Sequence, residues 1–170
     1  SVGHGMERPT FGANMGAMVS EAQRARAEGL CQRAQSEGAR AVTGGRKLNQ
    51  PGYFFEPTVF DGVTPEMNIA QEEVFGPVIS VMTFSDDDEA IRMANNTDYG
   101  LVAGVFTKDL DRATAAAQRL RAGQIYVNEW YAGGVETPFG GFGKTGYGRE
   151  KGREALYNYV QTKNIGIALG

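Results

Sequence analysis

The segment 71–77 brings two adjacent carboxylates, Glu72-Glu73, close to an aromatic ring, Phe75, just before Gly76-Pro77. An ionised carboxylate accepts hydrogen bonds and has room for two hydroxyl donors. Because Pro77 disfavours helical angles at the preceding residue, the segment is predicted to be a loop leading into a strand over 78–84. Glu73 and Phe75 are therefore expected at a strand edge, where α/β proteins commonly bind ligands. On these residues alone, a structural role for Glu73 as an arginine partner and Phe75 as a core residue fits at least as well.

A second candidate site is the glycine-rich segment 133–152, in which residues 141–146 contain both Gly-x-Gly-x-x-Gly and Gly-Lys-Thr. A P-loop needs a glycine where this chain has Pro138, which lacks the N–H and fixes φ. A dinucleotide fingerprint follows its strand directly and has an acidic residue about 20 positions later, and neither condition is met. We therefore expect a structured loop in which the backbone approaches another group closely.

Other residues with chemical potential favour structural roles. Cys31 lies on the apolar stripe of a predicted helix, with no histidine nearby in the sequence, which predicts an inert buried thiol. The acidic run 86–89 lacks the alternating oxygens and the glycine of a calcium loop and suits the first turn of a helix capped by Ser85. The chain has one cysteine and one histidine, so we expect no metal site and no internal disulfide.

Composition limits the class of protein. The chain has 170 residues, enough for one domain, and 24 glycines, about twice the usual frequency. Its net charge of -3, without a lysine or arginine cluster, argues against nucleic acid as a partner. No apolar run approaches the ~20 residues of a membrane span, and residues 1–5 lack a signal-peptide pattern. We expect a cytoplasmic protein with no membrane partner.

In the first half of the chain, the pattern predicts one helix and three strands. Ser20 is expected to cap the helix and Gly38 to end it. Its apolar positions follow the spacing of a single helical stripe, and they are Ala27, Leu30, Cys31 and Ala34. Strands are predicted at 41–43, 53–60 and 78–84.

In the second half, helices and strands alternate. Residues 85–94 and 109–120 are predicted as helices, and 101–107 as a strand covered on both faces. Asp109 is expected to cap the second helix. Gly123 is expected to end it in the left-handed backbone conformation, before a strand at 124–128. The inward stripe of that helix is predicted to contain Leu110, Ala113, Ala117 and Leu120. This alternation is typical of an α/β fold with a parallel-rich sheet and flanking helices.

At the end of the chain, residues 149–159 have a helical charge pattern and residues 159–170 alternate like a strand. Ile165, Ile167 and Leu169 are expected to point the same way. No obvious partner strand exists in the chain, so we expect this strand to pair with another subunit.

Five motifs together resemble the C-terminal part of an NAD(P)-dependent aldehyde dehydrogenase. Their order and spacing match over essentially the whole chain. They are Glu-Glu-Val-Phe-Gly-Pro at 72–77, Asn-Asn-Thr-Asp-Tyr-Gly-Leu at 95–101, Val-Asn at 127–128, Pro-Phe-Gly-Gly at 138–141 and Gly-Tyr-Gly-Arg-Glu at 146–150.

The resemblance implies roles for particular residues. Glu73 would accept hydrogen bonds from the nicotinamide ribose of NAD or NADP, and Phe75 would pack against the nicotinamide, with Leu101 nearby. Phe139 would line the aldehyde funnel, with Trp130 and Tyr131 in the substrate-facing loop. Residues 1–158 would form part of a catalytic α/β domain, and 159–170 an oligomerisation strand of a homodimer or homotetramer.

Two departures from the family pattern limit these implications. The family usually has a lysine directly after the aromatic that follows Phe-Gly-Gly. Here Gly143 holds that position and Lys144 follows, which puts the ion pair of that lysine in question. The nucleophilic cysteine, the general base, the oxyanion asparagine and the Rossmann region have no counterpart in the chain. No catalytic residue is therefore assigned, and the chain alone is expected to be inactive. The alternative is a non-catalytic oligomerisation or interaction module that keeps the scaffold.

Overall fold

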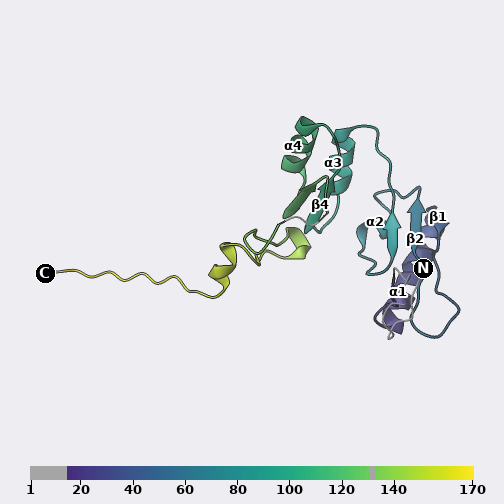
Figure 1. Cartoon of the computed structure of the whole chain (residues 1–170), viewed down its shortest axis with the longest axis horizontal. Helices are drawn as coiled ribbons and strands as arrows, with labels where there is room; N and C mark the ends of the chain where they lie inside the picture. Colours follow the sequence, from purple (N-terminus) through teal and green to yellow (C-terminus); the bar gives the residue numbers. More distant parts are fainter. Residues whose placement is uncertain (1–14, 131–132) are drawn as a thin grey trace. The chain divides into compact units, whose positions relative to one another are not determined.

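The structure is a computed structural model that describes residues 15–130 and 133–170. The chain divides into two compact units, one that ends at Ser85 and one that begins at Asp86. Each unit combines helices with a small sheet, and each sheet contains a parallel pair of strands (Figure 1). This arrangement confirms the α/β class. Among the described residues, every helix is too short or too polar to cross a membrane.

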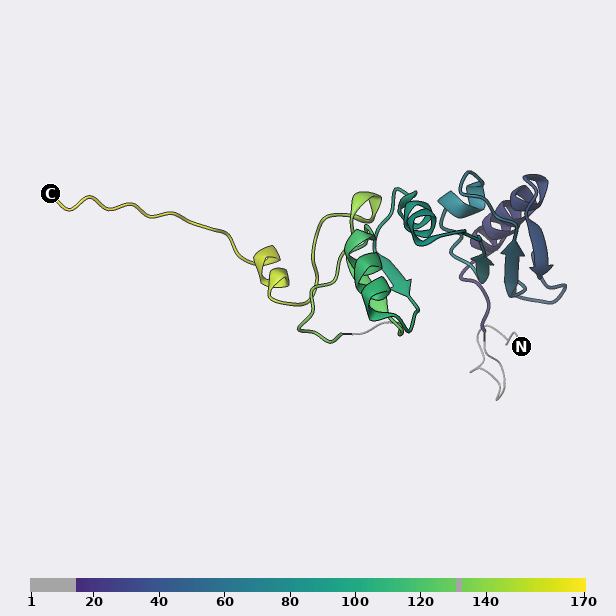
Figure 2. The ribbon, with the colours of Figure 1, turned by 90° about the horizontal axis from the view of Figure 1, so that it is seen from above.

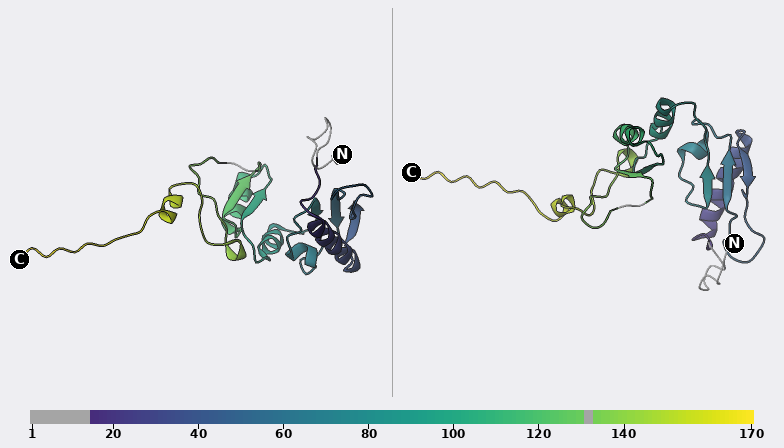
Figure 3. Two further views of the ribbon diagram at one scale, coloured as in Figure 1. Left: turned by 90° about the horizontal axis from the view of Figure 1, so that it is seen from below. Right: turned by 45° about the horizontal axis from the view of Figure 1, so that its top comes forward.

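The first unit is a three-stranded sheet with a long helix packed against it (Figure 3). Strand β2 lies in the middle, antiparallel to β1 and parallel to β3. The elements in chain order are α1 (Glu21–Ser36), β1 (Arg40–Thr43), β2 (Thr58–Asp61), α2 (Asn68–Gln71) and β3 (Val78–Ser80).

Helix α1 begins and ends where the local chemistry predicts. Ser20 has an extended backbone, and its hydroxyl accepts a hydrogen bond from the Gln23 N–H, as an N-cap does. At the other end the C-cap is Glu37, and Gly38 follows with φ +107°, a region that favours glycine. Both predicted boundaries are confirmed.

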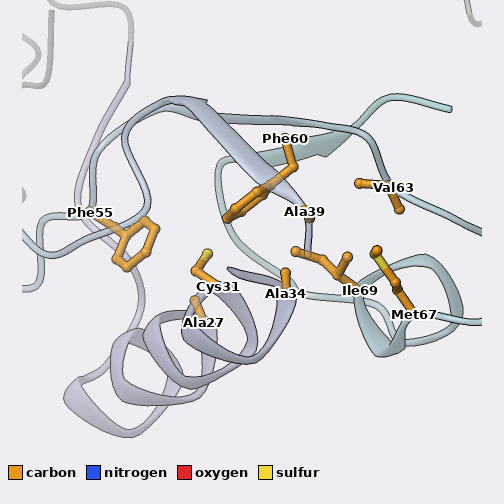
Figure 4. Close-up of a cluster of buried hydrophobic side chains, with 9 residues drawn as sticks. All are labelled: Ala27, Cys31, Ala34, Ala39, Phe55, Phe60, Val63, Met67 and Ile69. Carbon is orange, nitrogen blue, oxygen red and sulfur yellow. The ribbon is translucent and has the colours of Figure 1, made fainter. Parts of the chain in front are cut away.

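The core of the first unit lies between α1 and β2 (Figure 4). Ala27, Cys31 and Ala34 are fully buried on one face of α1, as the stripe predicts. Phe55 and Phe60 fill the space above them, and full burial of each ring contributes roughly 1.5–3 kcal/mol. Small residues on the helix allow the aromatic rings to approach its backbone closely.

The second unit has a two-stranded parallel sheet whose strands are joined through a helix (Figure 2). Helix α4 packs against both strands and against α3. The elements in chain order are α3 (Asp87–Asn95), β4 (Val102–Val105), α4 (Leu110–Arg119), β5 (Gln124–Val127) and the 3₁₀ helices η1 (Gly143–Thr145) and η2 (Glu154–Asn158). The β4–α4–β5 crossover confirms the parallel pattern predicted from the sequence.

The caps of these two helices test the sequence interpretation. Asp109 accepts a hydrogen bond from the Arg112 N–H at 3.0 Å, as predicted. For α3 the prediction was wrong by one residue, because Asp86 rather than Ser85 is the N-cap and accepts from the Glu89 N–H at 2.8 Å. The two side chains are comparable caps, but the Asp86 carboxylate also gains from the positive end of the helix dipole.

The prediction that β4 is covered on both faces was wrong. Its residues are at most half-buried, and Phe106, directly after the strand, is 68% exposed. Within this unit α4 and the ring of Trp130 cover the two-stranded sheet only in part. The predicted stripe of α4 holds for Ala113, which is buried, but Leu110 is 77% exposed at the first turn of the helix.

Two further expectations for the second unit need correction, and a third stays untested. Gly123 does not have a positive φ; a side chain there would collide with the Gly140 carbonyl oxygen, so close backbone approach requires the glycine. The helix predicted at 149–159 is reduced to η2, because Lys151 and Gly152 have φ near +60° and interrupt it. Residues 160–170 form no strand in the described chain, and their apolar side chains are exposed. A strand requires a neighbour for its backbone groups, so pairing with another subunit stays a prediction.

Candidate functional site

The loop 72–77 lies between α2 and β3, and it is anchored to the sheet at its end. The Thr58 N–H of β2 donates to the Pro77 carbonyl at 2.8 Å. Because β2 and β3 are parallel and the loop precedes β3, the loop lies at the amino ends of these strands. The sequence placed it at a strand edge without deciding which end, and it is not the carboxyl end favoured by many α/β sites.

Two side chains of α1 hold the loop by its backbone. The Gln23 amide donates to the carbonyl oxygens of Val74 at 2.8 Å and Phe75 at 3.1 Å. The Arg26 guanidinium donates to the carbonyl oxygens of Glu73 at 2.7 Å and Val74 at 3.2 Å. Three consecutive carbonyl groups are therefore fixed to one face of the helix.

Sequence reasoning missed Gln23 and Arg26. Their spacing of three residues, which places both on one helix face, was the available signal. Nothing in the sequence indicated that this face meets a loop about 50 residues away. Arg26 also lies 3.4 Å from the Glu72 carboxylate, so the arginine pairs with the first glutamate rather than the second.

The clamp, by which we mean Gln23 and Arg26 bonded to the backbone of the loop 72–77, leaves the predicted cofactor residues Glu73 and Phe75 accessible. Phe75 is 73% exposed and has φ +52°, a left-handed backbone that costs a residue with a side chain roughly 1–2 kcal/mol. Glu73 is exposed, and no described residue hydrogen-bonds or ion-pairs with its carboxylate. Both line a shallow groove of about 410 Å³ together with Ile69, Glu72, Val74, Gly76, Val78 and Ser80. A strained, exposed aromatic beside a free carboxylate is typical of a ligand-facing loop.

The remaining predicted residues that the structure describes lie in the second unit. Leu101 is half-buried and immediately precedes β4. Phe139 is half-buried and pairs with Glu150 through two backbone hydrogen bonds of 2.6 and 2.7 Å, and the Lys151 ammonium lies 5.4 Å from its ring centre. Both residues are thus held on ordered backbone.

Trp130 and Tyr131 were predicted for the substrate-facing loop. Trp130 is 67% exposed and makes an edge contact with the Tyr126 ring at 6.3 Å. Its indole also covers Gly104, where an added Cβ would lie 3.1 Å from the tryptophan ring. Trp130 therefore packs across the β4–β5 sheet, while Tyr131 lies outside the described residues.

The glycine-rich turn at 141–146 is bound to the turn before β4. The Lys144 N–H donates to the Asp98 carbonyl at 2.8 Å, and the Lys144 ammonium lies 2.6 Å from the Asp98 carboxylate. The hydrogen bond to Asp98 raises the pKa of Lys144. The lysine whose partner the sequence left in question is thus paired within this unit, and its backbone donor is engaged as well.

Cys31 has the properties of a core residue, as predicted. It is fully buried, and burial, with a smaller contribution from nearby Glu28, raises the pKa of the thiol to about 11. A thiol with this pKa is almost entirely protonated at neutral pH, and the thiolate is the reactive form.

Comparisons with known proteins place these features in a family. Residues 1–165 match the model of the aldehyde dehydrogenase family. Cytosolic aldehyde dehydrogenase 1 of Mus musculus is 45% identical over 158 residues, which are 93% of this chain and 32% of that protein. Betaine aldehyde dehydrogenase of Cereibacter sphaeroides is 46% identical over 156 residues, or 92% of this chain and 32% of that protein.

Solved structures agree. An NAD-dependent aldehyde dehydrogenase from Sinorhizobium meliloti has a TM-score of 0.89 and 41% identity, covering 93% of this chain and 32% of its own. A betaine aldehyde dehydrogenase variant from Staphylococcus aureus in complex with NAD+ has a TM-score of 0.85 and 38% identity, covering 89% of this chain and 32% of its own. The chain therefore belongs to the aldehyde dehydrogenase family, and it spans about a third of the length of these relatives.

Proposed function

We propose that this chain is part of an enzyme that oxidises an aldehyde to a carboxylic acid with NAD or NADP, and that it contributes residues to the cofactor site and to the aldehyde site. The observation that carries the proposal is the loop 72–77. Its backbone is fixed by Gln23 and Arg26, while the side chains of Glu73 and Phe75 remain free to meet a ligand. Rigid backbone beneath accessible side chains suits a loop that positions a reactant.

The residues of this loop fit the nicotinamide half of a dinucleotide. The Glu73 carboxylate can accept hydrogen bonds from both hydroxyls of a ribose, and the exposed Phe75 ring can lie flat against a planar base. When bound, the dinucleotide accepts the hydride that leaves the substrate carbon. The part of this chain is to restrict the position of the acceptor ring, which favours the reactive geometry. The NAD+ complex of a family member supports NAD as the cofactor, and NADP remains the alternative.

The second unit supplies the residues assigned to the aldehyde. Phe139 would line the entry funnel, with Leu101 towards the nicotinamide and with Trp130 and Tyr131 in the loop that faces the substrate. Their apolar side chains suit the hydrocarbon part of an aldehyde and exclude water from the reacting carbon.

The chain alone is proposed to be inactive. Oxidation of an aldehyde by this family requires a thiolate nucleophile, and the one cysteine of this chain, Cys31, is buried with its pKa raised to about 11. The nucleophile, its base and the oxyanion donor would come from other parts of the enzyme. The cytosolic names of relatives support a cytoplasmic location.

A homo-oligomer is proposed for the assembled enzyme. The exposed tail 159–170 alternates apolar side chains at Ile165, Ile167 and Leu169, which are 74–92% exposed. This pattern suits a strand that adds to a sheet of another subunit. The same tail supports the second candidate function, a non-catalytic oligomerisation module that retains this scaffold.

The test is to express the complete reading frame that encodes this chain and, separately, residues 1–170, and to assay both for NAD reduction with a panel of aldehydes. We expect activity from the complete protein and none from the isolated chain. An aldehyde-dependent reduction of NAD by the isolated chain would contradict the proposal. A reading frame that starts directly before Ser1, or a complete protein without a Gly-Gln-x-Cys motif, would favour the second candidate function, a non-catalytic oligomerisation module.

A further inference from the structure

In the second unit three backbone segments meet almost without intervening side chains: 98–101, 121–124 and 140–145. The Gly100 carbonyl accepts hydrogen bonds from the Gly123 N–H at 3.0 Å and the Phe142 N–H at 2.9 Å. A Cβ added at Gly123 would lie 1.7 Å from the Gly140 oxygen, and one added at Gly143 would lie 2.3 Å from the Asp98 oxygen. This contact requires glycine at position 143, and it places the Lys144 N–H against the Asp98 carbonyl at 2.8 Å.

One residue links the two segments assigned to the nicotinamide and to the aldehyde, through its backbone on one side and its side chain on the other. Gln124, the first residue of β5, donates from its backbone N–H to the Leu101 carbonyl at 3.0 Å. Its side-chain amide donates to the Pro138 carbonyl at 2.7 Å and to the Gly123 carbonyl at 2.9 Å. Gln124 is therefore bonded both to Leu101 and to the residue directly before Phe139.

The side chain of a second residue, Thr145, joins the segment 140–145 to the segment 98–101. The Thr145 hydroxyl accepts a hydrogen bond from the Gly100 N–H at 3.0 Å, one residue before Leu101. Thr145 is half-buried and belongs to η1, which follows the Phe139–Phe142 segment. Neither Gln124 nor Thr145 belongs to the set assigned to cofactor or substrate.

We propose that Gln124 and Thr145 are positioning residues that fix the backbone of Leu101 relative to the Pro138–Phe139 turn and so set the width of the aldehyde entry. This inference rests on the proposed function for the identity of the ligand, but the bonded arrangement stands on its own. Because the side chains of both residues bond to backbone groups of other segments, loss of these bonds should loosen the aldehyde site. It would not remove any group that contacts the reacting carbon.

The test uses Gln124→Met and Thr145→Val in the complete protein. Each substitution keeps the size of the side chain but removes its hydrogen bonds, which are two at Gln124, only one of them reaching the Pro138 segment, and one at Thr145. Matched controls on the exposed surface of α4 are Gln118→Met and Thr114→Val, of which the second removes a hydrogen bond of 2.8 Å to the Leu110 carbonyl, outside the segments under test. Loss of one hydrogen bond of about 1 kcal/mol corresponds to about a fivefold change. We expect amide exchange in peptides covering 98–101 and 138–145 to accelerate about fivefold, and the KM for the aldehyde to rise by a similar factor with kcat nearly unchanged.

Thr145→Ser keeps the hydroxyl and should restore both exchange and KM. Equal exchange rates in the variants and wild type would overturn the proposal, as would equal effects from the α4 controls or failure of Thr145→Ser to rescue. Unchanged KM with accelerated exchange would also overturn it, because the contacts would then be structural only. A wild-type protein that oxidises no aldehyde would contradict the proposed function, while the exchange experiment would still test the bonded arrangement.

Discussion

The clamp between α1 and the loop 72–77 can be tested by Gln23→Met. Methionine has nearly the same length as glutamine but donates no hydrogen bond, so the variant loses the bonds to the Val74 and Phe75 carbonyls at 2.8 and 3.1 Å. At about 1 kcal/mol each, these bonds contribute about 2 kcal/mol. The left-handed backbone of Phe75, at φ +52°, costs roughly 1–2 kcal/mol and opposes them. With only the Arg26 bonds remaining, we expect the loop to relax and Phe75 to leave its strained conformation.

The assay is hydride transfer in the complete protein, followed as NADH formation in a single turnover. A loss of about 1.4 kcal/mol in positioning corresponds to a rate about tenfold lower. Urea unfolding should show a free energy of unfolding that is lower by at most about 1 kcal/mol, because relief of the Phe75 strain offsets part of the lost bonds. The matched control is Gln32→Met, which makes the same change on the exposed face of the same helix. If Gln23→Met transferred hydride as fast as this control, the clamp would have no part in positioning the loop.

Three further changes follow from the described contacts. Hydrogen bonds from Asn68 hold the pKa of Glu37 below its ordinary value of 4.5. The stabilisation is therefore present above pH 4.5 and is lost as the pH falls through the lower pKa of the folded state. Glu37→Gln should reduce the loss of stability at acid pH, measured by urea unfolding, and an unchanged acid dependence would argue against this contact. Gly123→Ala should lower the free energy of unfolding by about 3 kcal/mol, because the added Cβ would lie 1.7 Å from the Gly140 oxygen. The control, Gly29→Ala in α1, has open space around it and should be neutral or stabilising. Equal effects of the two substitutions on stability would refute the backbone contact. Cys31 should resist iodoacetamide in the native protein and react completely in urea, and prompt native alkylation would contradict its burial.

Much of the fold could be predicted because local signals agreed with the tertiary contacts. Ser20 and Asp109 are the N-caps of α1 and α4, and the Ala27 to Ala34 stripe is the buried face of α1. The errors arose where two local solutions compete or where burial depends on distant chain. Ser85 and Asp86 are adjacent caps of similar strength, and the apolar run around β4 signals burial without saying what covers it.

The candidate site could be predicted only in part. The types of residue at 73 and 75 left a structural role open, and the resemblance of five motifs assigned both to a ligand-facing loop; the structure describes both side chains as exposed. The contribution of Gln23 and Arg26 could not be inferred, because hydrogen bonds to backbone carbonyls leave no pattern in the residue types of the loop. Gln124 escaped notice for the same reason, since it binds Pro138 through a main-chain oxygen.

The central claim is that the free carboxylate of Glu73 orients a cofactor. Glu73→Gln in the complete protein keeps the shape of the side chain, and no described residue bonds to the carboxylate, so thermal unfolding should be nearly unchanged. Single-turnover NADH formation should fall by about tenfold, as one charge-assisted hydrogen bond to a ribose hydroxyl is weakened. A variant that forms NADH at the wild-type rate would remove Glu73 from the cofactor site and contradict the account.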